Sequence, residues 1–206
     1  MILVLTTYRT GSTSFCNQLA EQHSFENLDE CFHESLSKKF VQKNPQYGTS
    51  EGMPNIHKET LRYITKNPNC IVKLMPYHNA NSDIGNVVDV LIGMAEKIYV
   101  LIRKDFDQQC QSYYICKRLG GGWHDQWEDK VDITLDKDRW LWCVNFLHNE
   151  YCDLQAWYEM INKVYLDKFS GLMFTHQLNQ KDKYQRPIRW DKAPGFTNID
   201  IEELFI

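Results

Sequence analysis

The sequence predicts an α/β fold in which a parallel β-sheet is flanked by helices. Four short runs of the chain are apolar on both faces, as strands of a sheet covered on two sides must be. Segments with helical spacing of apolar residues lie between these runs, and alternating strands and helices are typical of βαβ units. Because 206 residues without an internal repeat or a linker suit one domain, we expect a single domain over residues 1–206.

The predicted elements follow one another along the chain. The strands are expected at residues 2–7, 70–75, 97–102 and 163–166. The helices are expected at residues 13–22, 57–66, 84–94, 107–118 and 136–162. The last helix has apolar residues at steps of three and four, which favours a long helix across a sheet over a coiled coil of only three heptads. Two stretches without periodicity, 42–56 and 119–135, are expected to form long loops of the kind that line substrate sites.

Charge and composition exclude several classes of protein. The formal net charge of −4 argues against a bulk nucleic-acid binder, although it permits a local basic pocket. No run approaches the roughly 18 apolar residues that cross a bilayer. The chain opens directly on a predicted strand without a basic leader, so we expect a cytoplasmic protein. The seven scattered cysteines lack a Cys-x-x-Cys pair and are expected to be reduced, and no metal site is expected.

The turn after the first strand carries the most informative motif. Arg9, Thr10, Gly11, Ser12 and Thr13 stand between the strand and the start of a helix. Such a turn directs free backbone N–H groups and the positive end of the helix dipole at one point, where a phosphate or sulfate group can bind. The hydroxyl groups and the arginine add further donors. The alternative is an ordinary helix cap with a turn glycine.

Two better-known anion loops are absent from this turn and from the rest of the chain. The nucleotide loop Gly-x4-Gly-Lys-[Ser/Thr] is missing, because Gly11 is followed by Ser12 and the first glycine is lacking. The Cys-x5-Arg pattern of tyrosine phosphatases is missing as well. An ATP- or GTP-hydrolysing enzyme is therefore disfavoured.

A second basic segment ends the strand predicted at residues 97–102. Arg103 and Lys104 follow this strand, and Ser112 lies in the next predicted helix. Ligands of open α/β sheets bind at the carboxyl edge, where these cations are expected. The alternative is a basic pair at the surface with a solvated serine.

Together, the two segments resemble those of sulfotransferases that use 3′-phosphoadenosine 5′-phosphosulfate (PAPS). The first resembles the family's 5′-phosphosulfate loop, with Tyr8 in place of the usual proline and Thr10 in place of the usual serine. The second resembles the 3′-phosphate site, with Arg103 and Ser112 as the gripping pair and Lys104 as the alternate. Residues 164–167 are loosely similar to a late family strand, so the similarity extends over about residues 1–167.

The resemblance implies a P-loop-NTPase-like sulfotransferase fold and a set of site residues. Arg9, Thr10, Gly11, Ser12 and Thr13 are expected to bind the donor, together with Arg103 and Ser112. Arg9 is also expected to stabilise charge on the leaving phosphate.

The residue that takes the acceptor's proton is open among three candidates. Glu30-Cys31-Phe32 resembles a Glu-Tyr-Phe segment in bacterial glycolipid sulfotransferases, which makes Glu30 a candidate base. His33 is its rival because imidazole titrates near neutral pH, and His78 is the third candidate. Lys73 resembles a lysine on the equivalent strand of the same branch. The alternative is a solvated acidic loop with ordinary surface histidines.

The sequence therefore predicts sulfuryl transfer from PAPS to a hydroxyl or amine of a small molecule, glycan or lipid headgroup. Tryptophan faces can stack a sugar ring, although core packing is their commoner role; the four in this part of the chain are Trp123, Trp127, Trp140 and Trp142. A kinase of related fold and a non-catalytic nucleotide-binding protein are the alternatives. The non-catalytic hypothesis gains if the three candidate bases point away from the Arg9 loop.

Overall fold

The computed structural model describes residues 1–33, 56–82, 84–118, 135–175 and 201–205, and the statements below concern those residues. Its strands are β1 (Ile2–Thr6), β2 (Glu26–Asn27), β3 (Cys70–Leu74), β4 (Lys97–Arg103) and β5 (Phe169–Thr175). Its helices are α1 (Ser12–His23), α3 (Ile56–Lys66), α4 (Pro76–Ala80), α5 (Val87–Met94), α6 (Phe106–Arg118), α7 (Lys137–Val164) and the short 3₁₀ helix η3 (Glu202–Phe205).

The strands form one parallel sheet in the order β2-β3-β1-β4-β5, which confirms the predicted fold class. β1 is central, with Leu3 opposite Val72 of β3 on one side and Ile98 of β4 on the other. The chain therefore passes to one side of β1 for β2 and β3 and to its other side for β4 and β5. Crevices at such a reversal, at the carboxyl ends of the strands, are where open α/β sheets bind ligands.

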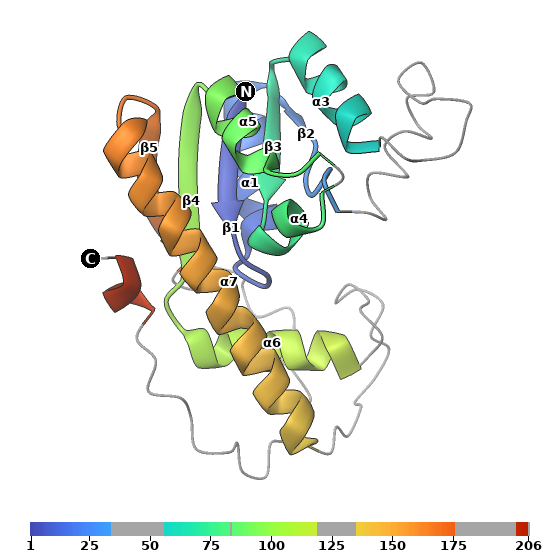
Figure 1. The fold of residues 1–206 in the computed structure, drawn as a ribbon, viewed down its shortest axis with the longest axis vertical. Coiled ribbons are helices and arrows are strands. Elements are labelled where there is room, and N and C mark those ends of the chain that lie inside the picture. Colours follow the sequence, from blue (N-terminus) through green and yellow to red (C-terminus); the bar gives the residue numbers. More distant parts are fainter. Residues whose placement is uncertain (34–55, 83, 119–134, 176–200, 206) are drawn as a thin grey trace.

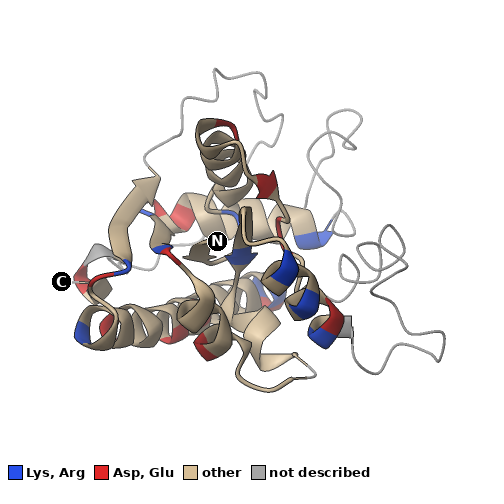
Figure 2. Ribbon diagram, turned by 90° about the horizontal axis from the view of Figure 1, so that it is seen from above, with Lys and Arg blue, Asp and Glu red and all other residues tan. Residues whose placement is uncertain are grey.

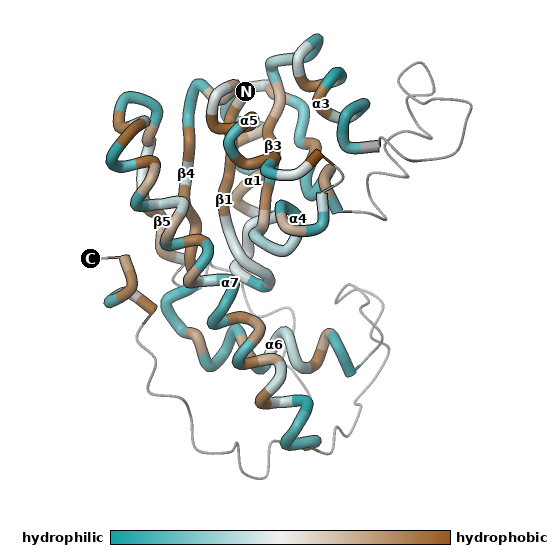
Figure 3. Tube along the Cα trace, viewed as in Figure 1, coloured by the Kyte–Doolittle hydropathy of each residue, from teal (hydrophilic) through white to brown (hydrophobic). Residues whose placement is uncertain are grey.

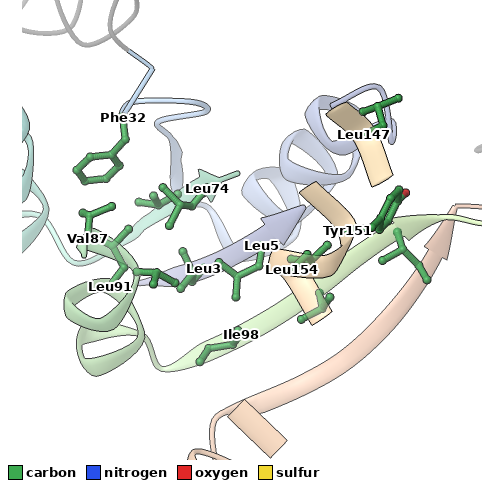
Figure 4. Close-up of a cluster of buried hydrophobic side chains, with 14 of the residues drawn as sticks. Leu3, Leu5, Phe32, Leu74, Val87, Leu91, Ile98, Leu147, Tyr151 and Leu154 are labelled. Atoms are coloured by element: carbon green, nitrogen blue, oxygen red, sulfur yellow. The ribbon is translucent and has the colours of Figure 1, made fainter. Parts of the chain in front are cut away.

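Helices cover both faces of the sheet. Successive residues of β1 point to opposite faces: Leu3 and Leu5 enter the larger core, whereas Ile2 and Val4 pack with residues of α1. The larger core takes residues from α5, α6 and α7, and Figure 4 shows Val87 and Leu91 on one side of it and Leu147, Tyr151 and Leu154 on the other. Figure 3 shows the central strands as the most continuous apolar segments.

The predicted strand at residues 163–166 is wrong, so residues 164–167, which resemble a late family strand, do not form a strand here. The helical stripe continues past Ile161, and α7 ends only at Val164, with the Tyr165 N–H donating to the Ile161 carbonyl at 2.8 Å. Val164 and Leu166 are 59% and 66% exposed, so they are not core residues. The strand in this region is β5. It contains a serine and a glycine and lies at the edge of the sheet, so it is not a run that is apolar on both faces.

Smaller differences have local causes. α5 begins at Val87 rather than 84 because Gly85 has a φ of 72°, which no helix accommodates. The two-residue strand β2 is too short to show a pattern, and α4 is a single short helix that begins at Pro76, where proline is well tolerated. Nearly all of the two predicted long loops falls outside the described residues.

α6 and the amino-terminal half of α7 extend beyond the carboxyl edge of the sheet (Figure 1). α7 crosses the sheet from this region back toward β5, as the sequence predicts for a long packed helix. Two helices thus stand next to the edge where β1 and β4 end. Within the described part of the chain, no helix is both long and apolar enough to cross a membrane.

Candidate functional site

The loop between β1 and α1 presents the start of α1 without a side-chain cap. Gly11 is the N-cap residue; it has no side chain to cap the helix, and its φ is 82°. Arg9, two residues earlier, has a φ of 64°. The first intrahelical bond runs from the Phe15 N–H to the Gly11 carbonyl at 3.3 Å. The N–H groups of Ser12 and Thr13 precede that bond and so have no intrahelical partner. The start of α1 therefore leaves backbone N–H groups without helical partners, which is the arrangement an anion site needs.

The Thr10 hydroxyl lies inside the loop rather than facing a ligand. Its Oγ1 is 2.7 Å from Thr6 Oγ1, which in turn donates to the Leu101 carbonyl at 2.9 Å. Thr10 is 1% exposed, and its hydroxyl also lies 3.2 Å from the Thr7 carbonyl. Thr10 therefore fixes the loop through its side chain and can offer an anion only its main-chain N–H.

The structure brings the two predicted anion-binding segments into direct contact. Arg9 Nε donates to Ser112 Oγ at 3.0 Å, and Arg103 Nη1 donates to the Arg9 carbonyl at 3.1 Å. The other Arg103 amino group donates to Gln108 Oε1. Lys104 lies on the exposed side of the strand end, so the geometry favours Arg103 as the residue of this pair that serves the site.

The buried side-chain amide of Gln109 connects these two segments. Gln109 Nε2 donates to Thr7 Oγ1 at 2.9 Å and to the Tyr8 carbonyl, while Gln109 Oε1 accepts from the Tyr151 hydroxyl at 2.6 Å. The same hydroxyl accepts the Arg103 N–H at 3.1 Å. Gln109, Tyr151 and Thr7 are all fully buried. α6 and α7 thus fix both the loop and the end of β4.

Removal of the Tyr151 hydroxyl is expected to weaken the fold and the site together. Tyr151→Phe removes the hydrogen bonds of this hydroxyl to the buried Gln109 Oε1 and to the Arg103 N–H, which should lower the free energy of unfolding by about 2 kcal/mol. Urea unfolding measures this change. Tyr158→Phe, on the same helix, is the matched control and should shift it by less than about 0.5 kcal/mol. Equal effects of the two variants would contradict the network.

Lys73 joins the loop to the acidic segment after β2. Its side chain is 1% exposed, and its Nζ lies 2.6 Å from Asp29 Oδ1, 2.9 Å from Glu30 Oε1 and 3.0 Å from Thr13 Oγ1. Burial lowers the pKa of Lys73, but attraction by Glu30 and Asp29 outweighs it and raises the pKa above the usual value. Lys73 is therefore charged, and its charge is balanced by two carboxylates. Arg9 and Arg103 remain the main cations toward an anion.

The three candidate bases all lie on the same side of the loop. His78 Nε2 is 3.1 Å from the Tyr8 hydroxyl and 3.9 Å from Glu30 Oε2, and the His33 ring lies against the His78 ring at a centroid distance of 5.1 Å. Burial, with repulsion from His33 and Lys73, lowers the pKa of His78 to about 3. Such an imidazole is a weak base at neutral pH, so the lowered pKa argues against His78 and leaves Glu30 and His33 as candidates.

Sequence reasoning missed four residues of this region. Tyr8 enters the sequence motif only in place of the usual proline, yet its hydroxyl contacts His78. Gln109 and Tyr151 carry the buried network, and Glu150 is a buried carboxyl that accepts the Tyr77 N–H. A polar residue on the buried side of a helix was the available signal for Gln109 and Glu150. The apolar stripe of α7 does not mark Tyr151 as a residue of the site, because its ring packs in the core like the other residues of the stripe.

The predicted tryptophans divide between core and surface. Trp140 is 5% exposed and packs against Tyr114, as core packing requires, whereas Trp142 is 49% exposed. Trp123 and Trp127 lie outside the described residues. Lys and Arg positions and Asp and Glu positions are interspersed along several elements (Figure 2). Among the residues that the structure describes, no group of three or more His, Cys, Asp or Glu could hold a metal ion.

Comparison with known proteins adds no family to this description. No protein-family model matches the chain, and neither a curated protein nor a solved structure is significantly similar to it.

Proposed function

We propose that this chain is a sulfotransferase that moves a sulfuryl group from PAPS to an acceptor hydroxyl or amine. One observation carries the proposal: the two segments that resemble donor-binding motifs are in direct contact. Arg9 bonds to Ser112, 103 residues away in sequence, and Arg103 bonds to Arg9, 94 residues away. The parallel sheet with its anion loop after β1 supports the finer proposal of a P-loop-NTPase-like sulfotransferase fold.

The residues fit a donor with two phosphate groups. The uncapped start of α1 and the Arg9 guanidinium suit the 5′-phosphosulfate, and Arg103 with Ser112 suits the 3′-phosphate. PAPS supplies a sulfur atom that an acceptor oxygen can attack in line while the bond to the phosphate oxygen breaks. Arg9 and the loop amides then stabilise the negative charge left on that phosphate.

The acceptor's proton requires a base beside the loop. In the proposed reaction, Glu30 takes this proton as the new oxygen–sulfur bond forms, so that the acceptor leaves as a sulfate ester. Lys73 holds the Glu30 carboxylate at 2.9 Å and also binds Thr13 of the loop. This connection supports turnover over the non-catalytic alternative, because Glu30 and the Arg9 loop belong to one cluster of contacts.

The first test is calorimetric binding of 3′-phosphoadenosine 5′-phosphate, compared with AMP and ATP without metal. Binding that depends on the 3′-phosphate, followed by transfer of radiolabelled sulfate to an acceptor, is the expected result. Equal binding of AMP would remove the role of Arg103 and favour the kinase alternative. Absence of any binding would contradict the proposal.

Arg103 is expected to act mainly in donor binding. Arg103→Ala should raise the Kd for 3′-phosphoadenosine 5′-phosphate by at least about tenfold, since charge-assisted bonds to an anion contribute roughly 1.5–3 kcal/mol. Lys104→Ala, one residue further along, is the matched control and should change Kd by less than about twofold. Calorimetry measures both constants. If the two effects are reversed, Lys104 and not Arg103 serves the 3′-phosphate.

A further inference from the structure

The 3₁₀ helix η3 packs against α7 at the residue whose hydroxyl reaches the candidate site. Ile201 and Phe205 of η3 are 0% and 5% exposed and belong to the larger core. The Phe205 ring meets two tyrosine rings of α7 edge to face, with its centroid 6.3 Å from that of Tyr151 and 5.5 Å from that of Tyr158. The transfer chemistry above does not use these contacts.

The Tyr151 hydroxyl connects η3 to the two segments of the proposed donor site. It accepts the Arg103 N–H at 3.1 Å and donates to Gln109 Oε1 at 2.6 Å, and Gln109 Nε2 donates to the Tyr8 carbonyl of the loop. Hydrogen bonds weaken steeply when their distance and angle become poorer. The position of the Tyr151 ring therefore decides how firmly the end of β4 is held.

Aromatic packing fixes this ring. The Tyr151 side chain is completely buried in the core (Figure 4), and two phenylalanine rings contact it: Phe106 at 5.9 Å and Phe205 at 6.3 Å. Phe106 follows Arg103 closely in the chain and belongs to the same end of the site. Phe205 comes from a separate element and is an independent support. Its removal leaves a space into which the Tyr151 ring can tilt.

η3 depends on its apolar side chains for its place on α7. It is four residues long, and the bond from the Leu204 N–H to the Ile201 carbonyl measures 3.2 Å. A helix this short is not stable by itself, so the buried Ile201 and Phe205 side chains hold it. Such elements detach at a lower free energy than global unfolding requires. The docking of η3 is therefore coupled to the position of Tyr151.

We propose that Phe205 is a positioning residue for the 3′-phosphate site: it holds the Tyr151 ring, and the Tyr151 hydroxyl holds the end of β4 at Arg103. This inference rests on the proposed function, in which Arg103 binds the 3′-phosphate of the donor. The docking of η3 then sets the affinity for the donor, because only molecules with Arg103 in place bind it tightly. η3 thus acts on the site through the core.

Hydrogen exchange at the Arg103 amide, measured by NMR on the ligand-free full chain, tests the contact directly. The Val4 amide in the central strand β1 reports global opening, so the ratio of the two exchange rates isolates the end of β4. Phe205→Ala should raise this ratio at least about tenfold. Phe205→Leu keeps most of the apolar volume and serves where the alanine variant does not fold; it should raise the ratio at least about threefold.

Phe169→Ala is the matched control for both variants. It removes the same kind of ring from β5, where Phe169 packs on Tyr158 at 5.7 Å. The ratio of the Arg103 and Val4 exchange rates should change by less than about twofold in this variant.

Donor affinity, measured by calorimetry, tests the consequence for the site. Phe205→Ala should raise the Kd for 3′-phosphoadenosine 5′-phosphate at least about fivefold, and Tyr151→Phe should raise it to a similar extent. In a chain that already carries Tyr151→Phe, Phe205→Ala should add less than about twofold, because both changes act through the same hydroxyl. Phe169→Ala should leave the Kd unchanged.

Two results would overturn the inference. If the ratio of the Arg103 and Val4 exchange rates stays constant in the Phe205 variants, η3 serves only overall stability. If the effects of Tyr151→Phe and Phe205→Ala on Kd simply multiply, Phe205 acts by another route. Failure of the proposed function is distinct: the wild type then binds no 3′-phosphoadenosine 5′-phosphate, and the exchange ratio alone decides whether Phe205 positions Arg103.

Discussion

Replacement of Arg9 by alanine is expected to lower the rate of sulfuryl transfer by about 10²–10³-fold, the loss typical when a donor to a developing charge is removed. The guanidinium is fixed by its bond from Nε to Ser112 Oγ at 3.0 Å, so it is held at the loop before the reaction begins. A preorganised donor stabilises the leaving phosphate without reorganising at the moment of transfer. The single-turnover rate with saturating donor and acceptor measures this effect.

Two further variants separate charge from geometry at this position. Arg9→Lys keeps the positive charge but loses the planar fork, so its rate should lie between those of the wild type and Arg9→Ala. Arg62→Ala on α3 removes an arginine whose side chain is 67% exposed, and it should leave the rate unchanged. If Arg9→Ala transfers sulfate as fast as Arg62→Ala, Arg9 does not take part in the reaction.

The central strands were predictable from sequence because burial on both faces leaves an unmistakable pattern. β1 and β3 are five-residue runs in which every residue is buried, and β4 is buried at four of its seven residues. β5 defeats the same criterion because an edge strand has one neighbour and Ser170 lies exposed within it. The glycine and hydroxyl residues after β1 likewise predicted the turn before α1. They give no sign of α4, because a five-residue helix is too short to show a periodic pattern of apolar residues.

The candidate site was predictable in its parts but not in its connections. The sequence placed Arg9 and Arg103 at strand ends, and the order of the strands in the sheet brings those ends together. Which partner each residue takes depends on packing: the Thr10 hydroxyl turns inward, and Ser112 receives Arg9. Tyr151 shows the limit most clearly, because its ring belongs to the core while its hydroxyl serves the site.

Glu150 carries the second large effect, on stability rather than on rate. It is 5% exposed on α7, and its Oε2 has no hydrogen-bond partner among the described residues. Burial raises the pKa of this carboxyl to about 7, although the hydrogen bond from the Tyr77 N–H opposes the rise. The folded chain therefore holds a proton that the unfolded chain releases near the ordinary pKa of 4.5.

The sign of the pH dependence follows from this difference in proton binding. Between about pH 4.5 and pH 7 the folded state binds more protons than the unfolded state, so the Glu150 contribution to stability falls as the pH rises. At 1.36 kcal/mol per pKa unit, the loss by pH 8 amounts to about 3 kcal/mol. His78 acts oppositely, because its lowered pKa makes the folded state less stable as the pH falls below its usual value of 6.5.

Glu150→Gln isolates the carboxyl from these other groups. The amide keeps the shape and can still accept the Tyr77 N–H, but it does not ionise. We expect the variant to be more stable than the wild type by about 3 kcal/mol at pH 8 and nearly equal to it at pH 4.5, as measured by urea unfolding at several pH values. The free energy of unfolding of this variant should still rise with pH, because the effect of His78 is then no longer opposed by Glu150.

Glu159→Gln provides the matched control, since it makes the same chemical change at an exposed position of the same helix. Its difference from the wild type should stay within about 0.5 kcal/mol at every pH. If Glu150→Gln and Glu159→Gln have the same pH dependence, Glu150 ionises at its ordinary pKa. In that case the carboxyl must be reached by water or a cation, and the interior between α4 and α7 is more polar than the packing of Phe146 and Tyr77 indicates.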